Sequence, residues 1–199
     1  MFSLLYGLWK YAFSRDDYFI LILGLDNSGK TTLLEGIKMK YQSKYKGLKR
    51  ITSTVGLNVG VVDMPLFSSG VRLVIWDVGG QRELRTLWTK YFSECHALMF
   101  VVDSTDETRI QESIESFNQV IQNDMLNGVP LLLVVNKQDH DKSIDLLRIK
   151  KLFSQSVGRE WHAVAASGLT GQGVEEAMTW ILESVKNNSH NRPPKIPDG

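Results

Sequence analysis

The sequence predicts an α/β domain built on a doubly wound, mostly parallel sheet of six strands. Short apolar runs recur along the chain, and they are continuous rather than alternating, which is typical of strands buried on both faces. Segments with helical spacing separate several of these runs, as Ile110, Ile114, Phe117 and Ile121 do. Strand and helix therefore alternate, which favours a parallel sheet with helices on both faces.

The expected strands follow one another in a regular order. They lie at residues 18–23, 58–64, 71–76, 97–102, 131–135 and 161–166. The second and third have no helix between them, and residues 65–70 are expected to form their turn, so this pair predicts an antiparallel hairpin. Helices are expected from about Thr31 and along an apolar stripe from Val174 to Val185.

Length and composition suit one globular domain, since the chain has 199 residues, of which 43% are hydrophobic. We expect an amphipathic helix at residues 1–14, a globular domain at 15–190 and a disordered tail at 191–199. The net charge of +1 gives no reason to expect nucleic acid as a partner. The single cysteine, Cys95, excludes an internal disulfide, and the four histidines lack zinc-site spacing.

The segment G-L-D-N-S-G-K-T matches the pattern of a phosphate-binding loop that joins a strand to a helix. Its glycines permit a tight turn whose N–H groups point at phosphate oxygens. We expect Lys30 to reach the β- and γ-phosphates and Thr31 to bind Mg²⁺. The candidate nucleotide-binding residues here are Gly24, Leu25, Asp26, Asn27, Ser28, Gly29, Lys30, Thr31 and Thr32. This motif alone fits a kinase, an ATPase or a GTPase.

The segment W-D-V-G-G-Q, at residues 76–81, indicates a sensor of the γ-phosphate. Asp77 ends a strand, where a carboxylate would hold the Mg²⁺ shell through water, and Gly80 leaves an N–H free to meet the γ-phosphate. Gln81 follows and is the candidate catalytic residue, because it is placed to orient an attacking water. An ordinary strand-ending turn is the alternative, and the upstream phosphate loop favours the sensor.

Thr54 is the candidate switch residue, because a loop threonine here would close on Mg²⁺ only while the γ-phosphate is present. Thr52 and Ser53 offer hydroxyls too. We favour Thr54 since the V-G that follows it leads directly into the hairpin.

The segment N-K-Q-D predicts a reader of guanine, and hence GTP and GDP as ligands. Asp139 is placed to accept hydrogen bonds from the guanine N1–H and amine, Asn136 to brace the loop, and the Lys137 stem to lie over the purine. Ser167 and Gly168 follow the last expected strand, where a backbone N–H would meet the guanine O6; a simple turn is the alternative there.

These motifs, in this order, resemble the ADP-ribosylation factor branch of the Ras-like small GTPases across nearly the whole chain. T-V-G-L-N and S-G-L-T-G-Q-G-V add to the match, and Asp26 and Trp76 favour this branch over Ras or Rab. Leu57, Phe2, V-D-S-T-D-E and the R-P-P tail resemble the subgroup of ADP-ribosylation-factor-related proteins. The fold implied is that of a P-loop NTPase.

The resemblance also implies partners and a place in the cell. It implies a monomer with a guanine-nucleotide exchange factor and a GTPase-activating protein, and a hairpin that slides when GTP binds and ejects the N-terminal helix. Leu57, Trp76 and Tyr91 match the effector-facing aromatic cluster. For the subgroup it implies a Golgi membrane receptor and effectors, cytosolic and peripheral trans-Golgi localisation, and a role in vesicle trafficking.

Three departures from the family pattern matter. Leu57 replaces a phenylalanine, and Arg82 replaces an acidic residue after the glutamine. Thr54 and Asp77 are also further apart than usual, so we expect a longer tip on the hairpin.

The first 14 residues carry an apolar face at helical spacing. The face consists of Phe2, Leu5, Tyr6, Trp9, Ala12 and Phe13. Such a helix would pack into a groove of the domain, lie on a membrane surface, or alternate between the two.

The sequence therefore predicts a GTP-hydrolysing switch with slow intrinsic turnover that an activating protein accelerates. One alternative is a nucleotide-gated binding module with negligible hydrolysis. A second is a P-loop kinase, which would give no reason for N-K-Q-D.

Overall fold

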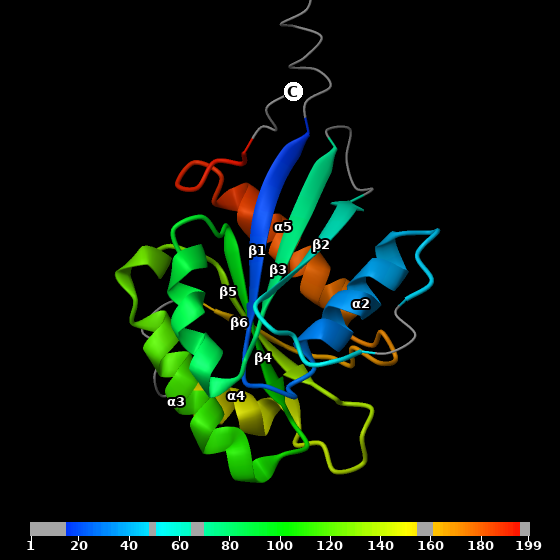
Figure 1. The fold of residues 1–199 in the computed structure, drawn as a ribbon, viewed down its shortest axis with the longest axis vertical. Helices are drawn as coiled ribbons and strands as arrows, with labels where there is room; N and C mark the ends of the chain where they lie inside the picture. The colour runs from blue at the N-terminus through cyan, green and yellow to red at the C-terminus, as the bar shows by residue number, and fades with distance from the viewer. Residues whose placement is uncertain (1–14, 48–50, 65–69, 155–160, 196–199) are drawn as a thin grey trace, which may run out of the picture.

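The computed structural model describes residues 15–47, 51–64, 70–154 and 161–195. A six-stranded sheet has the strand order β2-β3-β1-β4-β5-β6. The β2–β3 pair is antiparallel and the four other pairs are parallel. The predicted fold class is therefore confirmed, including the hairpin (Figure 1). The expected helix at residues 1–14 lies outside the described residues.

The bounds of the elements are close to those expected. The strands are β1 (Asp16–Leu23), β2 (Leu57–Met64), β3 (Val71–Val78), β4 (Ala97–Asp103), β5 (Leu131–Asn136) and β6 (His162–Ala165). The α-helices are α2 (Lys30–Tyr41), α3 (Ile110–Ile121), α4 (Leu146–Ser154) and α5 (Val174–Asn187). The 3-10 helices are η1 (Arg82–Tyr91), η2 (Glu107–Arg109) and η3 (Asp124–Leu126).

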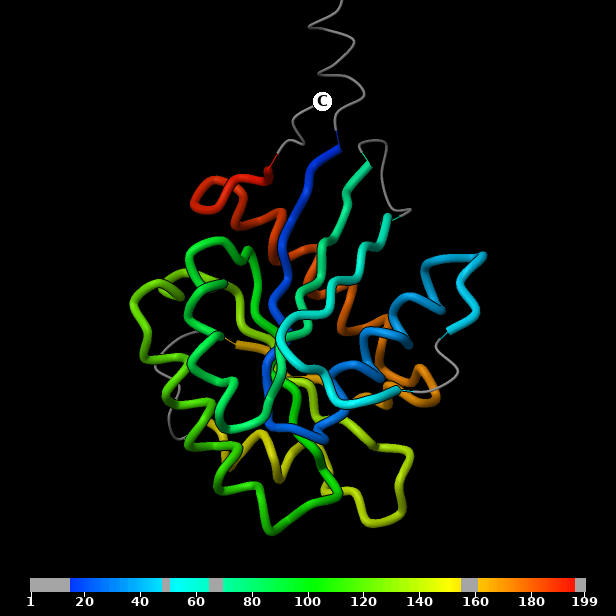
Figure 2. Tube along the Cα trace, in the orientation of Figure 1, coloured from blue at the N-terminus to red at the C-terminus, as the bar shows by residue number. Residues whose placement is uncertain are grey.

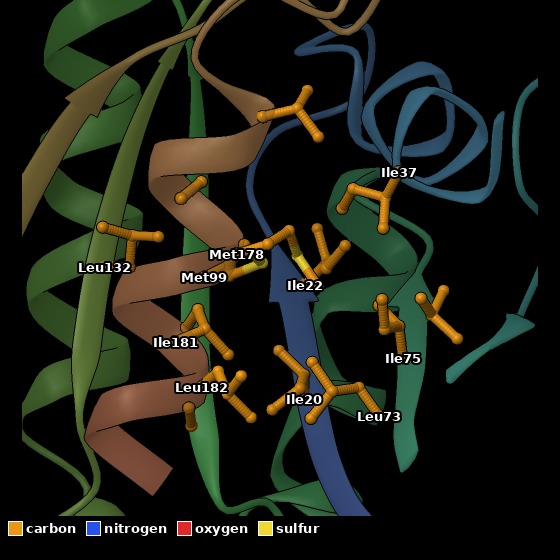
Figure 3. Packing of buried hydrophobic residues seen from close by; sticks show 14 of the residues in the cluster. Ile20, Ile22, Ile37, Leu73, Ile75, Met99, Leu132, Met178, Ile181 and Leu182 are labelled. Carbon is orange, nitrogen blue, oxygen red and sulfur yellow. The ribbon is translucent and has the colours of Figure 1, made fainter. Parts of the chain in front are cut away.

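Helices cover both faces of the sheet because the parallel strands are apolar on both sides. Leu33, Leu34 and Ile37 of α2 pack with the apolar face of α5 on one side, against Ile20 and Ile22 of β1. Figure 3 shows Met178, Ile181 and Leu182 of α5 facing these two isoleucines. Burial of this apolar surface is the main force that holds the helices to the sheet.

The opposite face carries a second core under α3, α4 and η1. Phe117 of α3 lies 5.1 Å from Phe100 of β4 and 5.1 Å from Phe153 of α4, between ring centroids, and both pairs are edge-to-face. Such pairs add about 1 kcal/mol each to the burial of their area. The expected stripe from Ile110 to Ile121 is this packed face of α3.

The carboxyl ends of the five parallel strands meet at one edge of the sheet. β1 leads into the phosphate loop there, and β3 leads into residues 79–81. β5 ends at Asn136, and β6 is followed by residues 166–168. In open α/β sheets ligands bind at this edge, so the topology brings all the predicted motifs together.

The tail does not behave as expected over residues 191–195. The Lys195 backbone pairs with Asp17 of β1 in both directions, at 3.0 Å each. The Arg192 guanidinium donates to the carbonyls of Phe92, Ser93 and Cys95. Residues 191–195 therefore differ from the expected disordered tail, because these hydrogen bonds attach them to β1 and to residues 92–95. Figure 1 shows this red segment beside the start of β1.

His96 joins the tail to the sheet. The Phe19 N–H donates to His96 Nδ1 at 2.9 Å, so Nε2 carries the proton and donates to the Pro193 carbonyl at 3.0 Å. The side chain is 4% exposed. Burial lowers the pKa of His96, and the nearby Arg192 and Lys195 charges lower it further. The hydrogen bonds require a neutral imidazole, because protonation of Nδ1 would break the hydrogen bond that Phe19 N–H donates to it.

Among the described residues, no helix combines the length and apolar character needed to span a bilayer.

We predict that His96 makes stability depend on pH. Its pKa in the folded protein lies below the ordinary value of 6.5. Between the folded pKa and about pH 6.5 the unfolded chain therefore binds more protons than the folded protein. The stabilisation is fully present above about pH 6.5 and is lost as the pH falls through the folded pKa. Urea unfolding between about pH 7.5 and 5.5 should show a smaller decline for His96→Leu than for the unaltered protein. His190→Leu, which removes an exposed histidine, gives the control. Equal slopes for all three proteins would contradict the assignment.

Candidate nucleotide-binding site

A cavity of about 300 Å³ lies at the carboxyl edge of the sheet, above the phosphate loop. It gathers residues from the phosphate loop, the switch loop, the sensor and the base reader. The lining residues are Asp26, Asn27, Gly29, Lys30, Thr31, Thr32, Ile51, Thr52, Ser53, Thr54, Gly80, Gln81 and Lys137. Figure 2 shows the cyan segment before β2 curving over the turn between β1 and α2.

The phosphate loop adopts the tight turn that its glycines predict. Gly29 has a φ of 89° and a Cβ there would lie 2.3 Å from Asn136 Nδ2, so only glycine fits. Asn27 also has a positive φ, of 61°. Ser28 is buried, and its hydroxyl has no hydrogen-bond partner in the structure. The α2 helix begins at Lys30, so its N-terminal N–H groups face the cavity.

Lys30 is held inside the loop. Its Nζ donates to the carbonyls of Gly24 at 3.1 Å and Leu25 at 2.8 Å. Burial lowers the pKa of Lys30 to about 8, while the charge of Asp77 opposes the shift. The ammonium therefore lacks a strong anionic partner in direct contact, which favours binding of an anion in the cavity.

The hydroxyls of Thr31 and Thr54, from two separate loops, meet at the carboxylate of Asp77. The Thr31 hydroxyl donates to Asp77 Oδ2 at 2.6 Å, and the Thr54 hydroxyl lies 3.2 Å from the same atom. The two hydroxyl oxygens are 2.7 Å apart. Burial raises the pKa of Asp77, and the threonine hydrogen bonds oppose it. Among the three hydroxyl residues of the switch loop, Thr54 is the one that makes this contact.

The same oxygens fit a magnesium site. Mg²⁺ prefers hard oxygen ligands and is held by one or two carboxylates together with phosphate oxygens. Among the described residues, Asp77 Oδ1 is buried with no hydrogen-bond partner, so this oxygen is free to accept a further donor or a cation. No group of three or more acidic, histidine or cysteine side chains in the described ranges is arranged as a metal cage. A cation here would therefore depend on ligand phosphates as well as on Thr31, Thr54 and Asp77.

Gly80 packs directly on the phosphate loop. A Cβ on Gly80 would lie 2.3 Å from the Gly24 carbonyl oxygen and 2.5 Å from Lys30 Nζ. The Gly80 carbonyl accepts a hydrogen bond from the Asp26 N–H at 3.2 Å. Gln81 lines the cavity and lies immediately before η1. This brings the predicted sensor and the predicted catalytic residue to the phosphate end of the site.

Asn136 ties the base reader to two other loops. Its Nδ2 donates to the Ser28 carbonyl at 2.8 Å, and its Oδ1 accepts from the Gly168 N–H at 3.0 Å. The residue is 2% exposed. The sequence predicted that Asn136 bonds the base edge and braces the loop, and in the structure its side chain joins the phosphate loop to residues 166–168.

Lys137 lines the cavity, whereas Asp139 does not. Lys137 has a φ of 65°, and its Nζ donates to Asp103 Oδ2 at 2.5 Å. Asp139 is exposed and is not among the residues that line the cavity. The cavity is therefore lined mainly by the predicted phosphate-binding residues, and Asp139 lies outside it. The loop that carries Asp139 is attached to Ala166, whose carbonyl accepts from the Gln138 N–H.

An apolar face continues from the site along the hairpin. Trp76 contacts Tyr91 with ring centroids 5.4 Å apart. Leu57 and Val59 are 39% and 45% exposed, and Val59 lies directly opposite Trp76 in the β2–β3 register. The three residues predicted to face effectors thus share one surface, and Val59 and the 40% exposed Val61 extend it.

Several polar residues that contact the site are not predicted by any sequence motif. Asp103 holds Lys137, and Arg109 donates to Asp26 at 2.7 Å. Arg85 donates to the Gly80 carbonyl at 3.0 Å. The V-D-S-T-D-E segment contained Asp103, but no spacing rule links it to a lysine 34 residues later.

The fold and the site together define a P-loop nucleotide-binding domain of the small GTPase class. The model of the ADP-ribosylation factor family matches residues 5–185. Among curated proteins, "ADP-ribosylation factor-related protein 1" from Rattus norvegicus is 48% identical and its Homo sapiens counterpart 47%, each match covering 100% of this chain and 99% of the relative. The chain therefore belongs to the ADP-ribosylation factor family, whose members bind GTP and GDP.

Two further comparisons agree with this membership. "ADP-ribosylation factor-like protein 3" from Saccharomyces cerevisiae is 39% identical over 98% of both chains. The solved structure of the Arl6 BBS3 small GTPase from Trypanosoma brucei, with the nucleotide analogue GppNp bound, has a TM-score of 0.74. It is 28% identical and the match covers 86% of this chain and 98% of that one.

We predict that Asn136→Ala weakens GDP binding by about 100-fold, because it removes two buried hydrogen bonds and leaves their partners unsatisfied. Equilibrium competition with a fluorescent guanine nucleotide measures the loss. Asn127→Ala is the matched control, since Asn127 is exposed and its side chain donates to Asp124. An Asn136→Ala protein with unchanged affinity would show that the brace does not support the site.

Proposed function

We propose that this chain is a GTP-hydrolysing molecular switch that regulates Golgi and trans-Golgi vesicle trafficking through nucleotide-dependent recruitment to membranes and effectors. The observation that carries the proposal is the contact of Thr54 with Thr31 and Asp77. It closes the loop at residues 51–56 over the phosphate loop. A γ-phosphate in the cavity would reinforce this closure, and its loss would release the loop.

Gln81 is the residue that we assign to hydrolysis. It lines the cavity and follows Gly80 directly in the chain. Its amide would orient the attacking water, while Lys30 would stabilise charge on the phosphates. Mg²⁺, when bound by Thr31 and Thr54 with Asp77 behind it, would neutralise charge on the phosphate oxygens. An arginine supplied by an activating protein would stabilise the charge that develops on the transferred phosphoryl group.

We predict that Gln81→Leu lowers single-turnover GTP hydrolysis by at least about tenfold, because the water loses its orienting group. Nucleotide affinity should stay within about twofold, since leucine leaves the phosphate loop intact. A radiolabelled phosphate-release assay on GTP-loaded protein gives the rate, with Gln111→Leu on the exposed face of α3 as control. Equal rates for all three proteins would remove Gln81 from the mechanism. No release by the unaltered protein, even with activator, would favour a nucleotide-gated binding module.

The effector surface would be the apolar face around Trp76 and Tyr91. Leu57 is joined to the site because β2 follows the switch loop directly, and Gly79 donates to the Gly56 carbonyl at 2.9 Å. Opening of the loop at Thr54 would therefore move this surface. Its exposure and apolar character support binding of effectors in the closed state.

Membrane recruitment would depend on residues 1–14, which lead directly into β1. Arg15 is in contact with the hairpin, since its guanidinium donates to Asp63 of β2 at 3.1 Å. A sliding hairpin would therefore act on the start of β1, next to the apolar N-terminal segment. An exchange factor, an activating protein and a Golgi receptor would complete the cycle of this cytosolic and peripheral membrane protein, which we propose acts as a monomer.

We predict that protein loaded with a GTP analogue floats with liposomes and that GDP-loaded protein does not, because only the former would expose the apolar N-terminus. Flotation of the full chain and of a chain lacking residues 1–14 tests this. The shortened chain should stay with the soluble fraction in both states. Flotation independent of nucleotide would contradict the toggle.

A further inference from the structure

Two arginines and two acidic residues form a chain of ion pairs beside the site. Arg85 of η1 donates to Glu112 Oε1 at 2.7 Å, and Arg109 donates to Glu112 Oε2 at 3.1 Å. Arg109 also donates to the Asp26 carboxylate at 2.7 Å and to the Asp26 carbonyl at 3.2 Å. Glu112 thus lies between the two arginines and uses one oxygen for each.

The chain closes into a ring through the backbone of the sensor. Arg85 Nε donates to the Gly80 carbonyl at 3.0 Å, and the Asp26 N–H donates to the same oxygen at 3.2 Å. That carbonyl belongs to the peptide that joins Gly80 to Gln81. Two donors therefore fix the orientation of this peptide plane. One donor comes from the phosphate loop, and the other is held in place by Glu112.

The geometry makes Glu112 the centre of the ring. Without its carboxylate the two guanidinium groups would repel one another. Arg85 would keep Ser116 and the Gly80 carbonyl as partners, and Arg109 would keep Asp26. The side chains are only partly exposed, at 17% for Arg85, 31% for Arg109 and 40% for Glu112. Ion pairs in a partly buried network are stronger than isolated surface pairs. The arginines also hold the pKa of the Glu112 carboxyl below its ordinary value.

We propose that Glu112 is a positioning residue for the reaction at Gln81. It acts through Arg85, which fixes the Gly80–Gln81 peptide, and through Arg109, which fixes Asp26 in the phosphate loop. This inference rests on the proposed GTPase function. It adds a contribution from α3, an element that supplies no residue to the cavity lining.

The ring also favours the closed arrangement of the sensor. It exists only while the Gly80 carbonyl lies against the Asp26 N–H, and a γ-phosphate at the Gly80 N–H would reinforce that arrangement. GDP offers no such contact. The ring should therefore slow the release of a GTP analogue and leave the release of GDP almost unaffected.

Glu112→Gln tests the proposal, because the amide keeps the shape of the side chain but cannot accept two charged hydrogen bonds. Single-turnover GTP hydrolysis should fall about tenfold, and release of a non-hydrolysable GTP analogue should become about tenfold faster. GDP release and the melting temperature of the GDP-bound protein should match those of the unaltered chain. Glu115→Gln is the control, since Glu115 is one turn further along α3, is exposed and pairs with Gln111.

Arg85→Gln supplies a second variant that breaks the ring at another place. Because part of the effect of Glu112 passes through Arg85, Glu112→Gln should slow GTP hydrolysis less in the Arg85→Gln background than in the unaltered protein. Hydrolysis and analogue release that stay unchanged in Glu112→Gln would overturn the proposal, as would equal acceleration of GDP release. If the unaltered protein fails to hydrolyse GTP, the proposed enzyme activity is wrong, and analogue release still decides the role of Glu112.

Discussion

The buried carboxylate of Asp77 is the constraint on which the arrangement of the site depends. It lies next to the last residue of β3 in the interior, and burial raises its pKa while hydrogen bonds from the threonines oppose the shift. Thr31 and Thr54 reach it from the phosphate loop and from the switch loop. Because Thr54 is joined to β2 through residues 55 and 56, the same carboxylate connects the phosphate end of the site with the exposed face of the hairpin.

Local sequence was enough to predict the sheet, the hairpin and most of the cavity lining. The phosphate loop and the sensor are contiguous segments whose chemistry is visible in their residue types. Parallel strands bring their carboxyl ends together, so segments such as 24–31 and 136–139 had to meet. The choice of Thr54 over its neighbours rested on the position of the hairpin, and the contact with Asp77 agrees with it.

The rest depends on contacts between residues far apart in the chain. In the sequence, Glu112 is one charged residue among several on an amphipathic helix. The fold brings Arg85 and Arg109 to its two carboxylate oxygens. The tail has the composition of a disordered segment, yet Arg192 finds carbonyls 97 and more positions upstream. His96 lacks any motif, and its role follows from Phe19 and Pro193. No local pattern encodes such pairs.

The measurement that tests the central claim most directly is the Mg²⁺ dependence of GTP-analogue affinity in the unaltered protein and in Asp77→Asn. If Asp77 with Thr31 and Thr54 forms the place where a cation and a γ-phosphate close the switch loop, the unaltered protein should bind the analogue much more tightly as Mg²⁺ is added. Asp77→Asn should lose most of this gain while retaining Mg²⁺-free binding. An affinity that does not respond to Mg²⁺, or responds equally in both proteins, would contradict the account.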